Sequence, residues 1–306
     1  MPALWGLLAL GCHRTAAPVT PPRPLLGDIK VEVGVPPDEP SPPQLDSASL
    51  EAWLRARLLA TGLFSAAGGD AGGTPRARVA ARIGVEAVEA GGKGEARTEV
   101  ALRLDDGRGE AADSLSFALE GRGSERYSVA APDRKGGAPG PAPRDAVVGE
   151  LVQRVTGDLI DDYVARRQIA HGPPAAVHAA LAADGGDLRE EAIRAAGERK
   201  LRDEAPRLLQ LLNDPDERTR DEALGALIAL GDRRAVTELT RTRSLRDRRE
   251  MRKIIEAIAI LGGREADDYL SFVAATHDDD EIRAEAAAAR ARLERRENDA
   301  TALGSK

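Results

Sequence analysis

The stretch RDEALGALIALGDRRAVTEL, residues 220–239, decides the fold of the C-terminal part of the chain. Its first half places apolar residues along one face of a helix, at Ala223, Leu224, Leu227 and Leu230. Gly231 can adopt the left-handed conformation that ends a helix, and Asp232 can cap the next one. The stretch therefore predicts two short helices in a hairpin. Such a hairpin cannot bury its apolar face alone, so it needs neighbours of the same shape.

The pattern returns along the chain. Four pairs of residues are 31 positions apart: Leu230 and Leu261, Gly231 and Gly262, Ala235 and Ala266, and Leu239 and Leu270. A more degenerate copy occupies residues 188–212, where Ala205 and Leu209 precede Ala235 and Leu239 by 30 positions. A last half-unit occupies residues 281–293, and Asp280 is expected to cap it.

The order Arg-x-Glu-Ala, Leu-Gly-Asp and Ala-Val within residues 220–239 resembles HEAT repeats of the short bacterial type. The pattern is weaker at residues 254–270, where Gly263 stands in place of Asp. The second helix of this copy is expected to be filled by Tyr269, Leu270, Phe272 and Val273. The resemblance implies an all-α HEAT-like solenoid over residues 174–297, and an irregular helical bundle is the alternative. Arrays of this family are mainly protein-binding scaffolds. Some relatives attach bilins to phycobiliproteins, but no residue here matches a chromophore-handling motif. Residues 298–306 are expected to form a disordered tail.

The N-terminus is apolar and runs into the single cysteine, as LALGC at residues 8–12. This apolar stretch is shorter than the roughly 20 residues that span a membrane. It resembles a bacterial lipobox, in which the cysteine becomes lipid-modified and is the first mature residue. The sequence departs from that family because no basic residue precedes His13. The resemblance implies a signal peptide at residues 1–11, lipid attachment at Cys12 and a Pro-rich tether at residues 12–27. The alternative is a frayed apolar terminus with a free thiol in a cytosolic protein.

Residues 28–170 show the mixed pattern of an α+β domain. Alternating apolar residues predict strands at residues 29–35, 77–85, 98–104 and 115–119, and helical spacing predicts helices at residues 47–61 and 144–168. Asp105-Asp106-Gly107 predicts a turn. The Gly- and Pro-rich residues 122–143 predict a mobile loop with a short strand at residues 127–129. This order of elements favours an antiparallel sheet with two helices packed on one face.

The Leu-x-x-x-Leu helix of this domain is followed by Thr-Gly-Leu-Phe at residues 61–64 and then by a strand meander. That combination is similar to small α+β domains of bacterial envelope lipoproteins, such as the amino-terminal domain of the translocation protein TolB. The resemblance implies a location in the bacterial cell envelope, with a membrane-anchored lipoprotein as the expected form.

Composition limits the classes of partner. The net charge of -7 argues against a general polyanion binder, and aromatic residues at 3% leave little for base stacking, so no nucleic-acid partner is expected. Because Cys12 is the only cysteine, intrachain disulfides and cysteine-rich metal sites are excluded.

The sequence offers no motif for catalysis or for metal binding. It holds no nucleophile elbow, phosphate loop or dinucleotide fingerprint. His171 and His178 flank Gly-Pro-Pro without a paired carboxylate, and the acidic residues 277–281 lack the glycine turn of a Ca²⁺ loop. These histidines and acidic residues are expected on the surface. We expect no catalytic residue, no metal and no cofactor.

One cluster of charge is a candidate for binding. Seven cations fall within 13 residues, and they are called the basic run below: Arg241, Arg243, Arg246, Arg248, Arg249, Arg252 and Lys253. Because the run falls between two repeats, several guanidiniums could share one edge of the solenoid and bind the acidic surface of another protein or anionic headgroups. The alternative is an Arg-rich solvated loop, since only six of the 44 basic residues of this chain are lysines.

These features together predict a membrane-anchored envelope lipoprotein that acts as a non-catalytic protein-interaction scaffold. Two alternatives remain open at the level of sequence. One is a cytosolic HEAT-repeat adaptor, and the other is a HEAT-type lyase or maturation factor.

Overall fold

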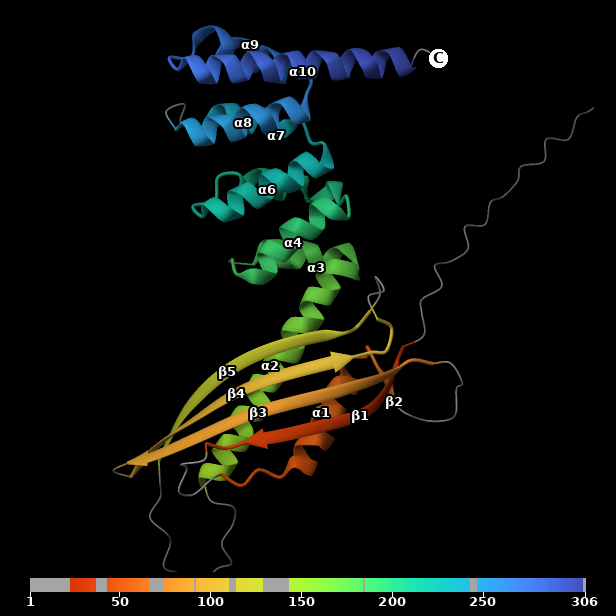
Figure 1. The fold of residues 1–306 in the computed structure, drawn as a ribbon, viewed down its shortest axis with the longest axis vertical. Coiled ribbons are helices and arrows are strands. Elements are labelled where there is room, and N and C mark those ends of the chain that lie inside the picture. Colours follow the sequence, from red (N-terminus) through yellow and green to blue (C-terminus); the bar gives the residue numbers. More distant parts are fainter. Residues whose placement is uncertain are drawn as a thin grey trace, which may run out of the picture. The chain divides into compact units, whose positions relative to one another are not determined.

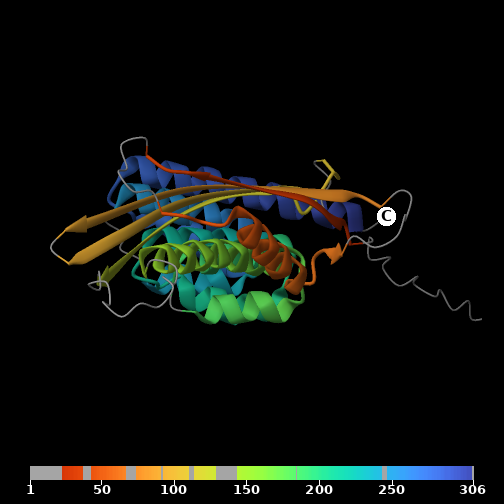
Figure 2. The same ribbon diagram turned by 90° about the horizontal axis from the view of Figure 1, so that it is seen from below.

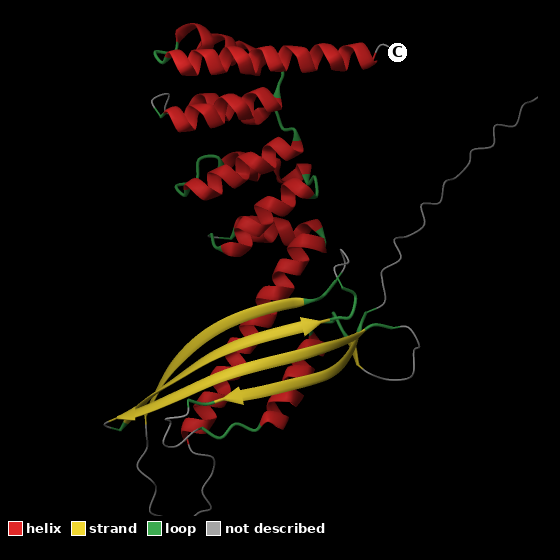
Figure 3. Ribbon diagram, in the orientation of Figure 1, coloured by secondary structure: helices red, strands yellow, loops and turns green. Residues whose placement is uncertain are grey.

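The computed structural model describes residues 23–36, 43–66, 74–90, 92–109, 114–128, 143–183, 185–242 and 247–304. The chain divides into two compact units, residues 1–161 and 162–306. The first contains a sheet with helices and the second is helical (Figure 3). The predicted fold class, an α+β domain followed by a helical repeat region, is confirmed.

The elements of the first unit follow the predicted order. They are β1 (Leu25–Gly34), α1 (Ser47–Ala60), β2 (Ser65–Ala66), β3 (Arg76–Ala90), β4 (Lys93–Asp105), β5 (Phe117–Ser128) and the start of α2 (Pro143–His171). The five strands form one sheet in the order β2-β1-β3-β4-β5 (Figure 1).

The sheet is mixed, so the prediction of a purely antiparallel sheet is wrong. β1 runs parallel to both β2 and β3, whereas β3, β4 and β5 are antiparallel neighbours. The reason lies in the connections. Helix α1 separates β1 from β3, and a helical crossover returns the chain to the same end of the sheet, which makes the two strands parallel. A tight hairpin joins β3 to β4 and reverses direction.

Both helices of this unit pack on the same face of the sheet (Figure 2). Leu50 of α1 and Val148, Leu151 and Val152 of α2 join one apolar cluster with inward residues of β3 and β4, which include Ile83, Val85 and Val100. The alternation predicted for these strands is confirmed, because their apolar residues are buried while the intervening positions face solvent. The opposite face of the sheet carries none of the helices described for this unit.

Strand β5 extends through residues 122–128, which the sequence assigned to a loop. The rest of that predicted loop, residues 129–142, lies outside the described residues. Gly121 and Gly123 of β5 lie beneath α2. A Cβ atom added to Gly123 would come within 2.5 Å of Val155 and 3.1 Å of Leu151, and one at Gly121 would come within 3.1 Å of Leu159. Glycine in this strand therefore permits close approach of a helix, a role that is hard to distinguish from a loop signal in sequence.

The turn after β4 is confirmed, but Asp106 within it is completely buried. Its carboxylate accepts hydrogen bonds from the Arg108 amide at 3.1 Å, from the hydroxyls of Ser114 and Ser116 at 3.1 and 3.0 Å, and from the Leu115 amide. Burial raises the pKa of Asp106, but these hydrogen bonds outweigh it, so that the pKa lies below its ordinary value. Asp106 thus ties the end of β4 to the residues that lead into β5.

We expect Asp106→Asn to lower the free energy of unfolding of the first unit by about 2 kcal/mol at pH 7, because an amide cannot accept all of these donors. A carboxyl whose pKa is lowered by folding stabilises the protein above its unfolded pKa of about 3.9, and the stabilisation is lost as pH falls through the folded value. Urea unfolding at pH 7 and pH 3 should therefore show a smaller loss on acidification for the variant than for the wild type. Equal losses would contradict this role.

The second unit continues as a series of helices after α2. They are α3 (Pro174–Ala182), α4 (Asp187–Glu198), a 3₁₀ turn η1 (Arg202–Glu204), α5 (Ala205–Leu211), α6 (Glu217–Leu230), α7 (Arg234–Thr242), α8 (Arg248–Leu261), α9 (Arg264–Thr276) and α10 (Asp280–Gly304). Helices α4, α6, α8 and α10 stack on one another, and α5, α7 and α9 form a second layer (Figure 1). One apolar cluster extends from Ile169 to Leu293.

The predicted hairpin of residues 220–239 is α6 and α7. Gly231 ends α6 with φ 68° and ψ 32°, and the Asp232 carboxylate accepts from the Arg234 amide at 3.1 Å. The apolar pairs placed 31 positions apart are buried, as are the two equivalent alanines. In the degenerate copy, however, Leu208 is fully buried and Leu209 only partly. The 3₁₀ turn before α5 winds more tightly than an α-helix, which shifts the inward face by one residue.

Three of the four stacked helices begin with an aspartate cap, whereas Gly186 at the start of α4 makes no side-chain cap hydrogen bond. Asp216, Asp247 and Asp279 accept hydrogen bonds from first-turn amides of α6, α8 and α10. The cap predicted at Asp280 is therefore one residue off, because α10 already includes Asp280. Arg220 donates to the carbonyls of residues 214 and 215, and Arg283 donates to those of 277 and 278, so each arginine holds the preceding loop.

Two predicted boundaries are corrected. Residues 298–304 continue α10 instead of forming a tail, because no glycine or proline interrupts the helix before Gly304. The first unit ends at Asp161, inside α2, and not at residue 170. The last turns of α2 belong to the second unit, where Arg199 donates to the Ile169 carbonyl at 2.6 Å.

Candidate interaction surface

The basic run lies on two helices and the connection between them. Arg241 is in the last turn of α7, and Arg248, Arg249, Arg252 and Lys253 are in the first turns of α8. Its two remaining members, Arg243 and Arg246, lie outside the described residues.

Two members of the basic run connect α8 to α10. Arg248 pairs with Asp279 and lies 3.6 Å from Glu281. Arg252 reaches Glu281 at 3.1 Å and Glu285 at 2.8 Å. These guanidiniums therefore link one stacked helix to the next.

Lys253 makes the corresponding connection in the other direction, from α8 to α6. Its ammonium lies 2.7 Å from Asp221 and 3.4 Å from Glu217. The hydrogen bond to Asp221 raises the pKa of Lys253, and the carboxylates of Glu217 and Glu250 add to the effect. Arg241 pairs locally with Glu238 at 3.3 Å on its own helix.

Among the described members of the basic run, only the side chain of Arg249 makes no ion pair with a described residue. It is exposed, and its backbone amide bonds to the Asp247 cap at 2.8 Å. Much of the positive charge that the sequence concentrates here is thus compensated by neighbouring helices. The exposed guanidinium of Arg249 has no ion-pair partner among the residues that the structure describes.

We expect Arg248→Glu and Arg249→Glu to differ in their effect on stability. Arg248→Glu places a carboxylate against Asp279 and Glu281, so it should lower the thermal midpoint of the repeat region by about 3 °C. Arg249→Glu should leave the midpoint within about 1 °C, since no described ion pair is lost. Calorimetry of the full chain would measure both. Equal effects on the midpoint would show that the ion pairs of Arg248 with Asp279 and Glu281 contribute nothing to stability.

The exposure of Phe272 was missed at the level of sequence. Tyr269, Leu270, Phe272 and Val273 were all interpreted as filling α9, yet Phe272 is 57% exposed. Four residues within five positions cannot all point to the same side of a helix. Here Leu270 and Val273 are buried and Phe272 faces solvent. The 31-residue period could have predicted the exposure of Phe272, because Phe272 lies 31 positions after Arg241, which is also exposed.

A groove of about 560 Å³ adjoins Phe272, and it is called the Phe272 groove below. It is lined by Arg248, Phe272, Val273, Thr276, His277, Asp278 and Asp279. The lining thus comes from the first turn of α8, the end of α9 and the loop that leads to α10. One lining residue, Arg248, is a member of the basic run and is paired with Asp279.

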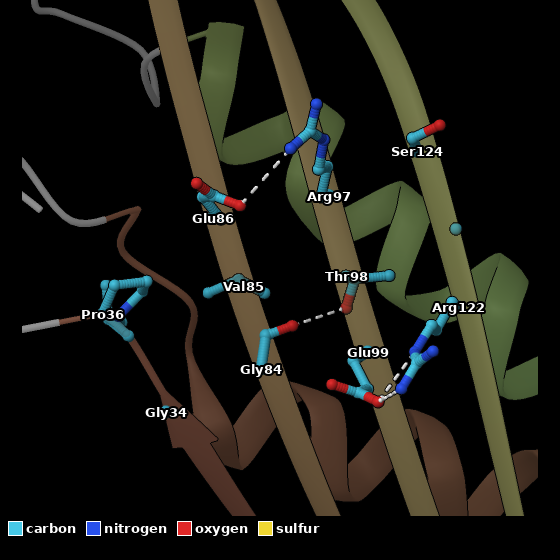
Figure 4. A pocket seen from close by; sticks show the side chains of 12 residues that line it. Gly34, Pro36, Gly84, Val85, Glu86, Arg97, Thr98, Glu99, Arg122 and Ser124 are labelled. Carbon is cyan, nitrogen blue, oxygen red and sulfur yellow. Dashed lines mark hydrogen bonds and ion pairs between the residues drawn. The ribbon is translucent and has the colours of Figure 1, made fainter.

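The sheet of the first unit carries a larger hollow of about 780 Å³ on the face away from its helices (Figure 4). Gly34 and Gly84 lie along it. Arg122 donates to Glu99 at 2.8 Å, and Arg97 lies 3.9 Å from Glu86. Because these charges are paired across neighbouring strands, the hollow does not indicate the chemistry of a ligand.

The histidines in the described part of the chain gather no metal ligands. His178 bonds through Nδ1 to the buried Glu204 at 3.1 Å, which links α3 to η1. His277 accepts a hydrogen bond from the Asp279 amide at 3.1 Å. Within the described ranges no three His, Cys, Asp or Glu side chains are arranged to hold a metal ion. Cys12, the predicted lipid attachment site, lies outside these ranges.

The comparison with protein families agrees with this geometry. Residues 174–252, from α3 into α8, match the family model of HEAT repeats. The C-terminal region therefore carries HEAT-like repeats, and such repeats indicate a protein-interaction scaffold. A search of curated proteins found no match. None of the helices in the described part of the chain is both long and apolar enough to cross a membrane.

Proposed function

We propose that this protein is a bacterial envelope lipoprotein whose HEAT-like array binds another protein without performing bond chemistry. The observation that carries the scaffold part of the proposal is the match of residues 174–252 to HEAT repeats, together with the stacked hairpins formed by α4 to α9. Stacking buries one side of each hairpin and leaves a continuous outer surface, which is how solenoids present themselves to partners.

The membrane anchor is proposed from the sequence. Residues 8–12 resemble a lipobox, and the prolines at positions 18, 21, 22 and 24 follow as a stiff tether. A lipid on Cys12 would hold the repeat array close to a membrane surface. One acyl chain gives only reversible membrane binding, so stable anchoring takes more than one chain.

The contact with the partner is proposed to involve an acidic protein surface and Arg249. This side chain is exposed, and it makes no ion pair with a described residue. Guanidinium groups bind carboxylates through paired hydrogen bonds, which makes arginine effective at interfaces.

Isolation of the protein from detergent-solubilised membranes tests both parts of the proposal. Mass spectrometry should find a lipid-modified Cys12 at the mature N-terminus, and Cys12→Ser should leave the membrane fraction. A partner that co-purifies with the wild type should be recovered about tenfold less with Arg249→Glu, which reverses the charge at an exposed position.

Arg264→Glu is the matched control, because Arg264 is also exposed but lies at the start of α9, away from the basic run. A protein that retains Met1 and stays soluble would refute the anchor. Equal recovery of the partner with both variants would refute the role of Arg249.

A further inference from the structure

Phe272 occupies a position that the repeats leave open to solvent. At successive intervals of 31 residues the same place is taken by Gln210 on α5, Arg241 on α7 and Phe272 on α9, and all three are exposed. Polar side chains at the first two positions fit a solvent-facing surface. A phenylalanine that is 57% exposed in a chain with only three phenylalanines is an apolar anchor without a described partner.

The Phe272 groove gives this side chain a complementary cavity. Val273 is 1% exposed, so its side chain belongs to the apolar core beside the groove. The aliphatic part of Arg248 and the methyl group of Thr276 add further apolar surface. At about 560 Å³ the groove lies within the range of sites that accept small ligands, and it can hold one or two side chains of a peptide.

The charges around the groove do not cancel. Arg248 pairs with Asp279 on the wall of the groove. Asp280, next to the lining residue Asp279, pairs with Arg283. Asp278 also lines the groove and is exposed, and its carboxylate makes no ion pair with a described residue. The groove therefore combines an apolar interior with an uncompensated negative charge at its rim.

We propose that the Phe272 groove binds a segment of a protein partner in which an apolar side chain lies beside a lysine or arginine. The apolar side chain packs against Phe272, and the cation pairs with Asp278. This inference rests on the proposed scaffold function, and it names the chemistry of one contact. An aromatic side chain at the centre of an interface is typical of residues that dominate binding.

The groove and Arg249 present charges of opposite sign. A partner that carries an acidic patch for Arg249 and a basic residue for Asp278 would fit in a single orientation. Charge complementarity of this kind fixes register more than it adds affinity. The two contacts can be removed separately, since they lie on different elements.

Selection from a random library of 12-residue peptides displayed on phage, against the immobilised full chain, tests the proposal. The wild type should enrich peptides with an apolar residue within two positions of Lys or Arg. Phe272→Ala should weaken binding of an enriched peptide at least about tenfold. Asp278→Lys should enrich peptides with Asp or Glu in place of the basic residue.

Ile260→Ala is the matched control, because Ile260 is another exposed apolar residue of the array, at 42%, and does not line the groove. It should bind the enriched peptide like the wild type. Unchanged thermal midpoints for the Phe272 and Asp278 variants would show that the fold persists, as expected for exposed side chains.

Two results would overturn the groove assignment. In the first, the wild type enriches peptides that bind Phe272→Ala equally well, which would leave the scaffold function standing with a different contact surface. In the second, the wild type enriches no peptides with this pattern. Recovery of a partner from solubilised membranes decides separately on the scaffold function.

Discussion

Close packing between neighbouring stacked helices is the constraint on which the repeat region depends. Small residues recur at the contact, with Ala195, Ala226 and Ala257 at intervals of 31 residues, and all three are buried. Gly197 of α4 lies so close to α6 that an added Cβ would be 2.9 Å from the Cα of Ala226. Larger side chains such as Leu227 and Ile258 then fill the space between the layers. The surfaces available to a partner are those that this stacking does not use.

The cations at the start of α8 divide in the same way, between residues used in stacking and residues left to solvent. Arg248, Arg252 and Lys253 connect stacked helices and are compensated there. Arg249, in the same turns of α8, faces solvent without such a partner. Adjacent arginines with identical chemistry therefore have different roles, and the difference depends on which neighbouring helix presents a carboxylate. The Phe272 groove arises at the same junction, where the first turn of α8 meets the end of α9.

The sequence predicted the features that depend on local periodicity. The hairpin of residues 220–239, the Gly231 terminus and the alternation in β3 and β4 follow from side-chain spacing and backbone preference. It failed where distant residues decide the outcome. The glycines of β5 make room for α2, the parallel pairing of β1 with β3 depends on the path of α1, and Asp106 is buried by residues that follow it. The pairing of the basic run and the exposure of Phe272 likewise depend on packing between repeats.

Two glycine-to-alanine substitutions in the full chain test the packing of the array most directly. Gly225 in α6 has no neighbouring atom within 4 Å of an added Cβ, whereas Gly197 in α4 meets the backbone of α6. Both gain helix propensity, worth about 1 kcal/mol. Urea unfolding followed by circular dichroism should therefore show Gly225→Ala more stable than the wild type and Gly197→Ala less stable by about 1–3 kcal/mol, because the stacked helices must separate. Stabilisation by both substitutions would contradict the close stacking on which this account rests.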